Sequence, residues 1–151
     1  MTARKLKRRL RFYPPYFGAG VRVKYISDDF RTATVEMPLR FYNRNYVGTH
    51  FGGSLYSMCD PFYMLMLINI LGPDYIVWDK AATIRFIRPG KGLVSATFNI
   101  TEEQIAQIRA AADFQSKVEP QFQVLVNDCE GNVVAEIDKV LYVRTKSANP
   151  G

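Results

Sequence analysis

The sequence predicts an α+β domain in which a curled antiparallel sheet of about five or six strands wraps around a long central helix. Residues 53–71 are apolar around nearly the whole circumference of a helix, which is typical of a helix buried on all sides. The segments before and after it alternate apolar and polar residues, as half-buried strands do. A single sheet that curls around the helix would cover it economically.

The chain of 151 residues has the length of one domain, and its 48% apolar and 23% charged residues are typical of a folded protein. We predict a basic tail or short helix over residues 1–12, one domain over 13–145 and a C-terminal tail over 146–151. The most apolar stretch, 55–71, contains Asp60 and Pro61 and falls short of a membrane span. No secretory signal is evident, so we expect a cytoplasmic protein.

The net charge of +6 belongs to the N-terminus, because residues 1–12 hold six bases and no acid and the rest of the chain sums to zero. A fold that binds nucleic acid needs a basic face on its body, so we expect no nucleic-acid partner. One alternative stays open, in which the basic segment alone contacts RNA or an acidic membrane.

Cysteine and histidine are too scarce for several kinds of site. Cys59 and Cys129 exclude a disulfide scaffold and a four-cysteine zinc site, and His50 is the only histidine. We therefore expect no metal. Cys59 is expected to be a buried structural cysteine, because no Cys-His pair stands at a plausible spacing.

The elements follow in order along the chain. Leu6 and Leu10 stand at helical spacing, and residues 21–27 and 31–39 alternate and flank an Asp-Asp turn, which predicts a hairpin. The central helix follows a loop over 40–52. Further strands are predicted over 75–89, 93–100, 118–128 and 133–144, with a helix over about 101–113 that opens on a capping box.

Two motifs resemble those of a known family. The pattern N-x-x-G-x-H-F-G-G over residues 45–53, with Asp60 behind it, and the I-R-F-I-R-P-G turn over 84–90 resemble the hotdog-fold acyl-CoA thioesterases. The phenylacetate-pathway type is the most similar, and residues 48–57 resemble a branch described as a domain of unknown function. The resemblance implies a hotdog fold and a thioester substrate carried by coenzyme A or an acyl-carrier protein.

Gly52 and Gly53 form the first candidate site. Two glycines at the start of a helix let a ligand approach the backbone, and the first N–H groups of a helix have no internal partner. Such groups can hold a thioester carbonyl and the oxyanion that forms on attack. The alternative is that the glycines only permit a tight turn into the helix.

Asp60 is the candidate general base. A carboxylate in an apolar helix must be paired, hydrogen-bonded or neutral, and such a group suits activation of water. Its position matches the acidic residue of the phenylacetate-type enzymes. Because Pro61 follows, Asp60 could instead cap the true helix start, or Pro61 could kink a longer helix. Asp79 is a reserve acidic candidate.

Asn45 and His50 precede the glycines, and the resemblance implies that they orient the thioester. In the family a histidine directly precedes the glycine pair, whereas here Phe51 stands there and His50 lies one residue earlier. A shift of one residue turns a side chain to the other side of the backbone, so we expect His50 to lie out of reach of the thioester. A 3-hydroxyacyl dehydratase reading would use the same histidine, but the proline-rich stretch of those enzymes is missing.

Arg85, Arg88 and Lys91 surround the Pro89-Gly90 turn, where the resemblance places the entrance for pantetheine. Arginine and lysine there would meet the phosphates of coenzyme A, although they could be ordinary solvated charges. Phe51 and Gly52 complete the expected substrate-binding residues. We expect no cofactor other than the coenzyme A of the substrate.

Two functions are therefore predicted: a thioesterase that uses Gly53 and Asp60, or a non-catalytic hotdog protein that binds acyl thioesters. The resemblance also implies a homodimer, possibly paired into a tetramer, joined through the strand that contains residues 78–88.

Overall fold

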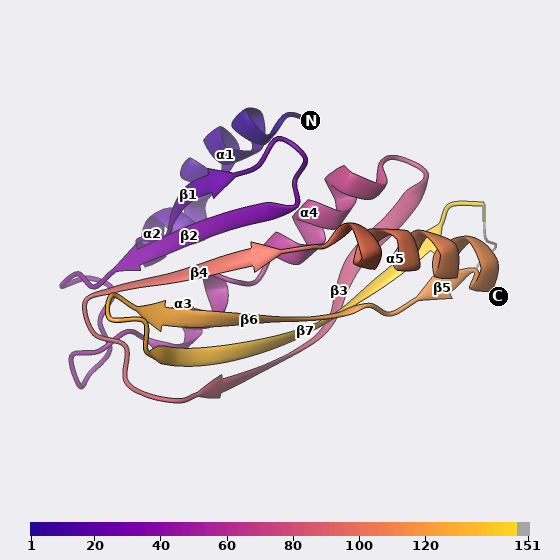
Figure 1. The fold of residues 1–151 in the computed structure, drawn as a ribbon. Coiled ribbons are helices and arrows are strands. Elements are labelled where there is room, and N and C mark those ends of the chain that lie inside the picture. Colours follow the sequence, from indigo (N-terminus) through magenta and orange to yellow (C-terminus); the bar gives the residue numbers. More distant parts are fainter. Residues whose placement is uncertain (148–151) are drawn as a thin grey trace.

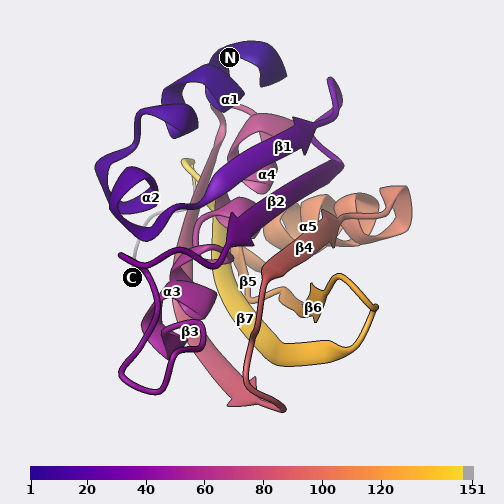
Figure 2. The ribbon, with the colours of Figure 1, turned by 90° about the vertical axis from the view of Figure 1, so that its left-hand side faces the viewer.

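The computed structural model describes residues 1–147, so residues 148–151 of the predicted C-terminal tail lie outside the described part. The seven strands form one antiparallel sheet in the order β1-β2-β4-β6-β7-β3, with β5 paired to β7. Their bounds are β1 Arg22–Ile26, β2 Thr32–Pro38, β3 Tyr75–Phe86, β4 Leu93–Asn99, β5 Lys117–Val118, β6 Gln121–Asp128 and β7 Val133–Thr145. The sheet curls around the central helical segments (Figures 1 and 2), which confirms the predicted fold class.

The central helix is interrupted rather than continuous. It consists of α3 (Gly52–Ser57) and α4 (Phe62–Leu71), separated by a turn that ends at Pro61. Proline cannot donate a backbone hydrogen bond, and its ring opposes a continuing helix, which explains the break. The span from Gly52 to Leu71 is long and apolar enough to cross a membrane by length and composition alone. In this fold it is the helix that the sheet surrounds.

The first hairpin is confirmed, but one face of β1 differs from the prediction. Val23 pairs with Val35, and the register then shifts so that Tyr25 pairs with Thr34 and Ile26 with Ala33. This β-bulge leaves Tyr25 53% exposed and buries Ile26. An alternating pattern predicts that every second residue of the strand points to the same side of the sheet. A bulge adds one residue, so the residues after it point to the opposite side from the one that the pattern predicts.

The basic N-terminal segment is a helix that belongs to the core. Helix α1 (Ala3–Arg11) begins at the Thr2 cap and buries Ala3, Leu6 and Leu10. A short second helix, α2 (Pro14–Ala19), starts at the proline pair, because proline is well suited to the first helical positions. The predicted break at these prolines is therefore the start of another helix.

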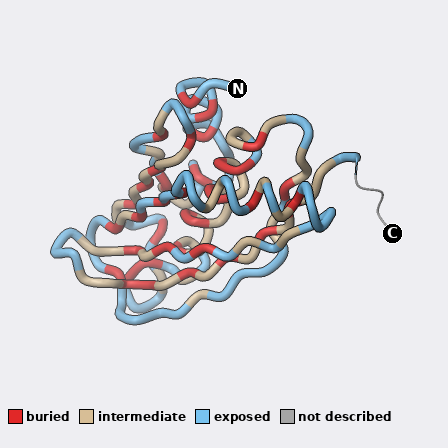
Figure 3. Tube along the Cα trace, turned by 45° about the vertical axis from the view of Figure 1, so that its right-hand side comes forward, coloured by how far each residue is buried: buried red, intermediate tan, exposed pale blue. Residues whose placement is uncertain are grey.

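The C-terminal half follows the prediction closely. Helix α5 (Glu102–Gln115) begins at Thr101 with the predicted capping box. The predicted strand over 118–128 is divided at Glu119-Pro120 into β5 and β6, because proline interrupts the ladder. Strand β3 lies at one edge of the sheet and is mostly exposed along its length (Figure 3), in contrast to the buried centre of β7.

Candidate functional site

Asp60 lies in the turn between α3 and α4, where its backbone N–H donates to the carbonyl of Tyr56 at 2.9 Å. Helix α4 has no side-chain cap, and the position before its first residue is Pro61. Asp60 therefore does not cap the second helix, and its carboxylate is available for other partners. Its side chain is 47% exposed.

The Asp60 carboxylate is one of three polar groups, from Asp60, Asp79 and Tyr56, that surround the buried ammonium of Lys139. Lys139 of β7, whose side chain is 1% exposed, reaches Asp60 Oδ1 and Asp79 Oδ1, each at 3.0 Å. Tyr56 of α3 donates its hydroxyl to the same Asp60 oxygen at 2.7 Å. Lys139 Nζ also lies 3.2 Å from the Tyr56 hydroxyl. The bonds from Tyr56 and Lys139 both use Asp60 Oδ1, and Oδ2 has no hydrogen bond or ion pair with the residues that the structure describes.

The cluster shifts the pKa values of Asp79 and Lys139. Burial raises the pKa of the Asp79 carboxyl; Lys139 opposes this shift, and the negative charge of Asp60 adds to it. Burial works against the charged form of Lys139, but its contacts with Asp60, Asp79 and Tyr56 raise the pKa of Lys139 above its ordinary value. The ammonium therefore stays charged at neutral pH and faces two carboxylates.

The sequence did not lead us to predict Lys139 as part of the site, nor that Asp79 and Asp60 would contact the same residue. The sequence did contain a sign of this lysine. Ile137, Lys139 and Leu141 are alternate residues on the inward face of β7, so Lys139 interrupts an apolar face. A buried lysine requires an acidic partner. The pairing of β3 with β7 brings Asp79 close to Lys139, because Asp79 of β3 lies opposite Leu141 of β7.

The entrance of α3 holds the two glycines as predicted. A Cβ added to Gly53 would lie 2.7 Å from the Phe51 ring, and one added to Gly52 would lie 3.0 Å from the ring of Phe86. The absence of side chains therefore lets two aromatic rings cover the start of the helix. Phe51 is 57% exposed, so its ring can move aside at little cost in packing.

Asn45 organises the loop before α3. Its Nδ2 donates to Thr49 Oγ1 at 3.0 Å, and its Oδ1 accepts from the backbone N–H of Thr49 at 3.0 Å and of Val47 at 3.2 Å. These bonds use the amide inside its own loop. The structure thus gives Asn45 a local structural role.

His50 joins this loop to the turn after β3. It is 3% exposed, its Nε2 lies 2.7 Å from the carbonyl of Gly92, and its backbone N–H donates to the carbonyl of Gly90 at 2.9 Å. Burial lowers the pKa of the imidazole. No contact joins His50 to Asp60 among the described residues. This geometry gives no support to a dehydratase role for the histidine.

The predicted basic entrance is divided between two environments. Arg85 is held by Glu136 at 3.0 Å and by Asp138 at 2.7 Å, on neighbouring strand β7. These two carboxylates raise the pKa of the Arg85 guanidinium. Arg88 and Lys91 are exposed in the turn between β3 and β4.

The structure also bears on two other kinds of site, a cysteine nucleophile and a metal centre. Burial raises the pKa of the Cys59 thiol strongly, which disfavours the thiolate that a nucleophilic cysteine needs. Among residues 1–147, no group of three or more His, Cys, Asp or Glu side chains could hold a metal ion.

The comparisons with known proteins agree with this architecture. A protein of unknown function from Pseudomonas aeruginosa, described as a "Probable Thioesterase", superposes with a TM-score of 0.85 at 21% identity, over 96% of this chain and 97% of its own. A protein of unknown function from Chlorobaculum tepidum gives 0.76 at 15% identity, over 96% and 98%. A thioesterase from Haemophilus influenzae gives 0.70 at 14% identity, over 100% and 96%.

At these identities the structural likeness establishes the fold, and no curated protein matches the sequence. The family model named "Domain of unknown function (DUF4442)" matches residues 2–143. The chain therefore belongs to the DUF4442 family, and it has the hotdog fold.

Proposed function

We propose that this protein hydrolyses an acyl thioester of coenzyme A or of an acyl-carrier protein, with Asp60 as the group that activates water. The observation that carries the proposal is the half-exposed Asp60 carboxylate, which Tyr56 and Lys139 anchor through Oδ1 in the turn between the two apolar helices α3 and α4. A fixed carboxylate with one available oxygen is suited to accept a proton from water.

The helix entrance supplies the second part of the mechanism. We place the thioester carbonyl at the backbone N–H of Gly53, because the first N–H groups of a helix have no intrahelical acceptor and the N-terminal end of its dipole is positive. The oxyanion that forms when water attacks would be stabilised there. Phe51 would move away to admit the carbonyl.

The carrier of the acyl group would enter at the turn between β3 and β4. Arg88 and Lys91 are exposed there and carry charge that suits the phosphates of coenzyme A or phosphopantetheine. Arg85 contributes less in this scheme, because Glu136 and Asp138 already hold its guanidinium. The protein would need no other cofactor and would act in the cytoplasm, where the exposed Cys129 would remain reduced.

A second copy of the chain would complete the site. Strand β3 is an unpaired edge of 12 residues, and Trp78, Phe86 and Ile87 on or beside it are exposed. An exposed edge with apolar side chains favours pairing with another strand. Since Asp79 lies on β3 and contacts Lys139, a homodimer through this edge would bring the partner close to the Asp60 cluster.

One observation favours a second candidate, a non-catalytic protein that binds acyl thioesters. The buried ammonium of Lys139 contacts Asp60 Oδ1 at 3.0 Å, so the carboxylate already has a structural task as the partner of a buried lysine. In this scheme the Gly53 entrance still holds the carbonyl, but no water is activated.

The test is a panel of acyl-CoA thioesters of different chain length, with release of free thiol as the readout, on wild type and Asp60→Asn. The amide retains the shape and accepts the bonds from Tyr56 and Lys139 but cannot take a proton, so turnover should fall by about 10²–10⁴. Asp74→Asn, at an exposed position beside α4, is the matched control and should keep full turnover. Equal rates for wild type and Asp60→Asn would refute the assigned base. Binding without turnover in both proteins would favour the second candidate.

A further inference from the structure

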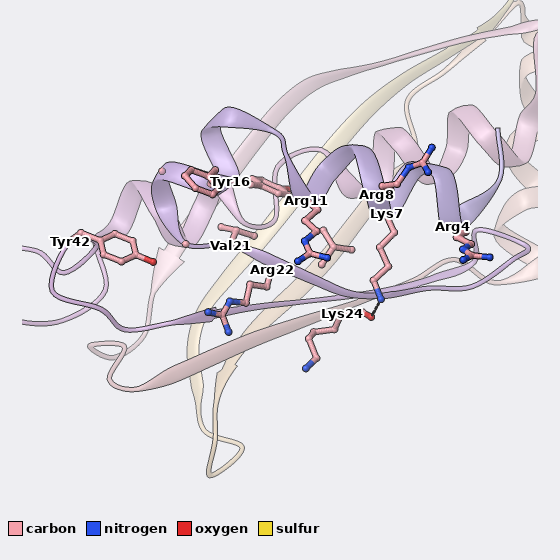
Figure 4. Close-up of a pocket in the computed structure, with 13 residues that line it drawn as sticks. Arg4, Lys7, Arg8, Arg11, Tyr16, Val21, Arg22, Lys24 and Tyr42 are labelled. Carbon is pink, nitrogen blue, oxygen red and sulfur yellow. Dashed lines mark hydrogen bonds between the residues drawn. The ribbon is translucent and has the colours of Figure 1, made fainter.

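A large hollow that Asp60 does not line lies between α1, α2 and β1. Its volume is about 1040 Å³, which is at the upper end of the range for small-molecule sites. The lining residues are Arg4, Lys7, Arg8, Arg11, Tyr16, Phe17, Gly18, Gly20, Val21, Arg22, Val23, Lys24 and Tyr42. Figure 4 shows Lys7 and Arg11 reaching from α1 toward β1, where Arg22 and Lys24 lie.

The charge of this cavity is entirely positive. Six of the lining residues are basic and none is acidic. Lys7 donates to the backbone carbonyl of Lys24 at 2.5 Å, and Lys24 pairs with Glu36 at 3.3 Å. The other four bases are Arg4, Arg8, Arg11 and Arg22. None of these arginines forms an ion pair with a carboxylate of the described residues. Because these positive charges share one hollow, their attraction for an anion adds up. An anion bound among them would also reduce their repulsion of one another.

The rest of the lining is apolar and rests on the core. Val21 is buried, Val23 is half-buried, and Tyr16 is 1% exposed. The ring of Tyr16 stacks on Phe62 of α4, with centroids 6.3 Å apart. At the cavity edge the ring of Phe17 is 78% exposed and adds apolar surface to the lining. An occupant must therefore be apolar over part of its length.

We propose that this cavity binds an anionic amphiphile, a molecule with a single acyl chain and a phosphate or carboxylate headgroup. The guanidinium groups hold the headgroup by charge-assisted hydrogen bonds. The chain lies against Val21, Val23 and the aromatic rings, where it removes apolar surface from water. The proposal does not depend on thioester hydrolysis at Asp60.

Single-stranded nucleic acid is the competing ligand, because its binding grooves also combine basic and aromatic side chains. Phe17 and Tyr42 have exposed rings at this cavity, but Tyr16 is enclosed by the core and offers no free ring face for stacking. Val21 and Val23, which complete the apolar wall, offer no stacking surface. The geometry of the lining thus favours an acyl chain over bases.

The binding experiment uses calorimetry with full-length protein and monomeric oleoyl lysophosphatidic acid, below its micelle concentration. Oleate tests a carboxylate headgroup, oleoyl lysophosphatidylcholine tests the same chain without net charge, and glycerol 3-phosphate tests the headgroup alone. The two anionic amphiphiles should bind at least about tenfold more tightly than either single-feature probe, since a charge-assisted hydrogen bond contributes about that factor.

Two variants locate the site. Arg11→Gln/Arg22→Gln should weaken binding by about tenfold or more, whereas Lys5→Gln/Arg9→Gln, which removes two charges of α1 outside the cavity, should leave it unchanged. Gly18→Trp should also weaken binding, because Gly18 lines the cavity and a Cβ there meets no atom within 4 Å. Thermal melting confirms that each variant is folded.

Three results would overturn the proposal. Equal affinity for the anionic and zwitterionic lysolipids would remove the role of charge. Unchanged binding in both cavity variants would place the ligand elsewhere. Binding to a single-stranded RNA or to vesicles of phosphatidylglycerol, without binding of the monomeric lysolipids, would assign the basic surface to a macromolecular partner.

Discussion

His50 shows how a residue suggested by a motif can serve the fold instead. Its ring is buried, and its Nε2 contacts the Gly92 carbonyl, which joins the loop before α3 to the turn after β3. Gly90 packs on the same ring, where an added Cβ would lie 3.1 Å from the imidazole. The displacement of the histidine by one residue thus places it against this turn, and the carboxylate cluster assembles without it.

We predict that His50 makes stability depend on pH in the mildly acidic range. Burial lowers the pKa of the imidazole below its ordinary value of 6.5, so the unfolded chain binds more protons than the folded one. The contribution of His50 to stability is therefore fully present above pH 6.5 and is lost as the pH falls toward the folded pKa. Urea unfolding at several pH values measures it, and in His50→Gln this part of the pH dependence should vanish, because the chain has no other histidine. A wild-type stability that is constant between pH 7.5 and 5 would contradict the assignment.

The buried tyrosines Tyr16 and Tyr63 differ in the hydrogen bonding of their hydroxyls. The Tyr16 hydroxyl is buried with no hydrogen-bond partner among the described residues, whereas the Tyr63 hydroxyl donates to the Gln123 carbonyl at 2.7 Å. Burial, with smaller effects of Cys59 and Asp60, raises the pKa of Tyr16, so its hydroxyl stays protonated.

We predict opposite effects on stability when each of these hydroxyls is removed. Tyr16→Phe should raise the free energy of unfolding by about 1 kcal/mol, because it removes an unsatisfied buried group. Tyr63→Phe should lower it by about 1 kcal/mol, because it leaves a carbonyl without its donor. Denaturant unfolding of both variants decides the matter, and a loss of stability in Tyr16→Phe would reveal a partner for that hydroxyl.

At the scale of elements, α1 is a structural part of the domain and does not behave as a tail. Its buried face is Ala3, Leu6 and Leu10, and its basic residues Arg8, Arg9 and Arg11 lie in the last turn, where they interact favourably with the helix dipole. The helix packs over β1, next to the edge of the sheet opposite β3 (Figure 2).

Leu6→Ala should therefore destabilise the whole domain. Leu6 is 5% exposed, and truncating a buried leucine costs about 2–5 kcal/mol. Lys5→Ala, at an exposed position of the same helix, should change the free energy of unfolding by less than about 0.5 kcal/mol. If both substitutions were equally mild, α1 would be only loosely attached, as a tail would be.

At the scale of the molecule, the sheet has two edges with different surroundings. Strand β1 is accompanied by α1, whereas β3 has no strand on its outer side within residues 1–147 and carries exposed apolar residues. The basic cavity lies at the first edge, and the Asp60 cluster lies beside the second. The two proposed sites use different residues, although Tyr16 of the cavity stacks on Phe62, the first residue of α4 after the turn that holds Asp60.

We predict that the protein is a dimer at micromolar concentration and that the β3 edges form its interface. Ala81 is an exposed residue near the middle of β3, so Ala81→Lys would place like charges on two adjoining edges. Sedimentation velocity should show a dimer for wild type and a monomer for Ala81→Lys. A monomeric wild type would contradict both the dimer and a site completed by the partner.

The sequence by itself determined the fold class and most element types. The apolar run over 53–71, the alternating segments and the capping box at Thr101 each reflect local periodicity or local hydrogen bonding, which neighbouring residues specify. It also identified Asp60 and the glycine pair as candidate residues. The position of its basic charge was evident too, because composition does not depend on folding.

Only the tertiary structure decided what those residues contact. Lys139 lies 79 residues from Asp60 in the chain, and the strand pairing and the curl of the sheet bring them within 3.0 Å. The cavity at the N-terminus likewise requires α1 to lie across from β1, so that bases that look like a tail in the sequence surround a hollow. Local patterns specify helices and strands, but contacts between distant segments depend on how those elements pack, and both candidate binding sites are made of such contacts.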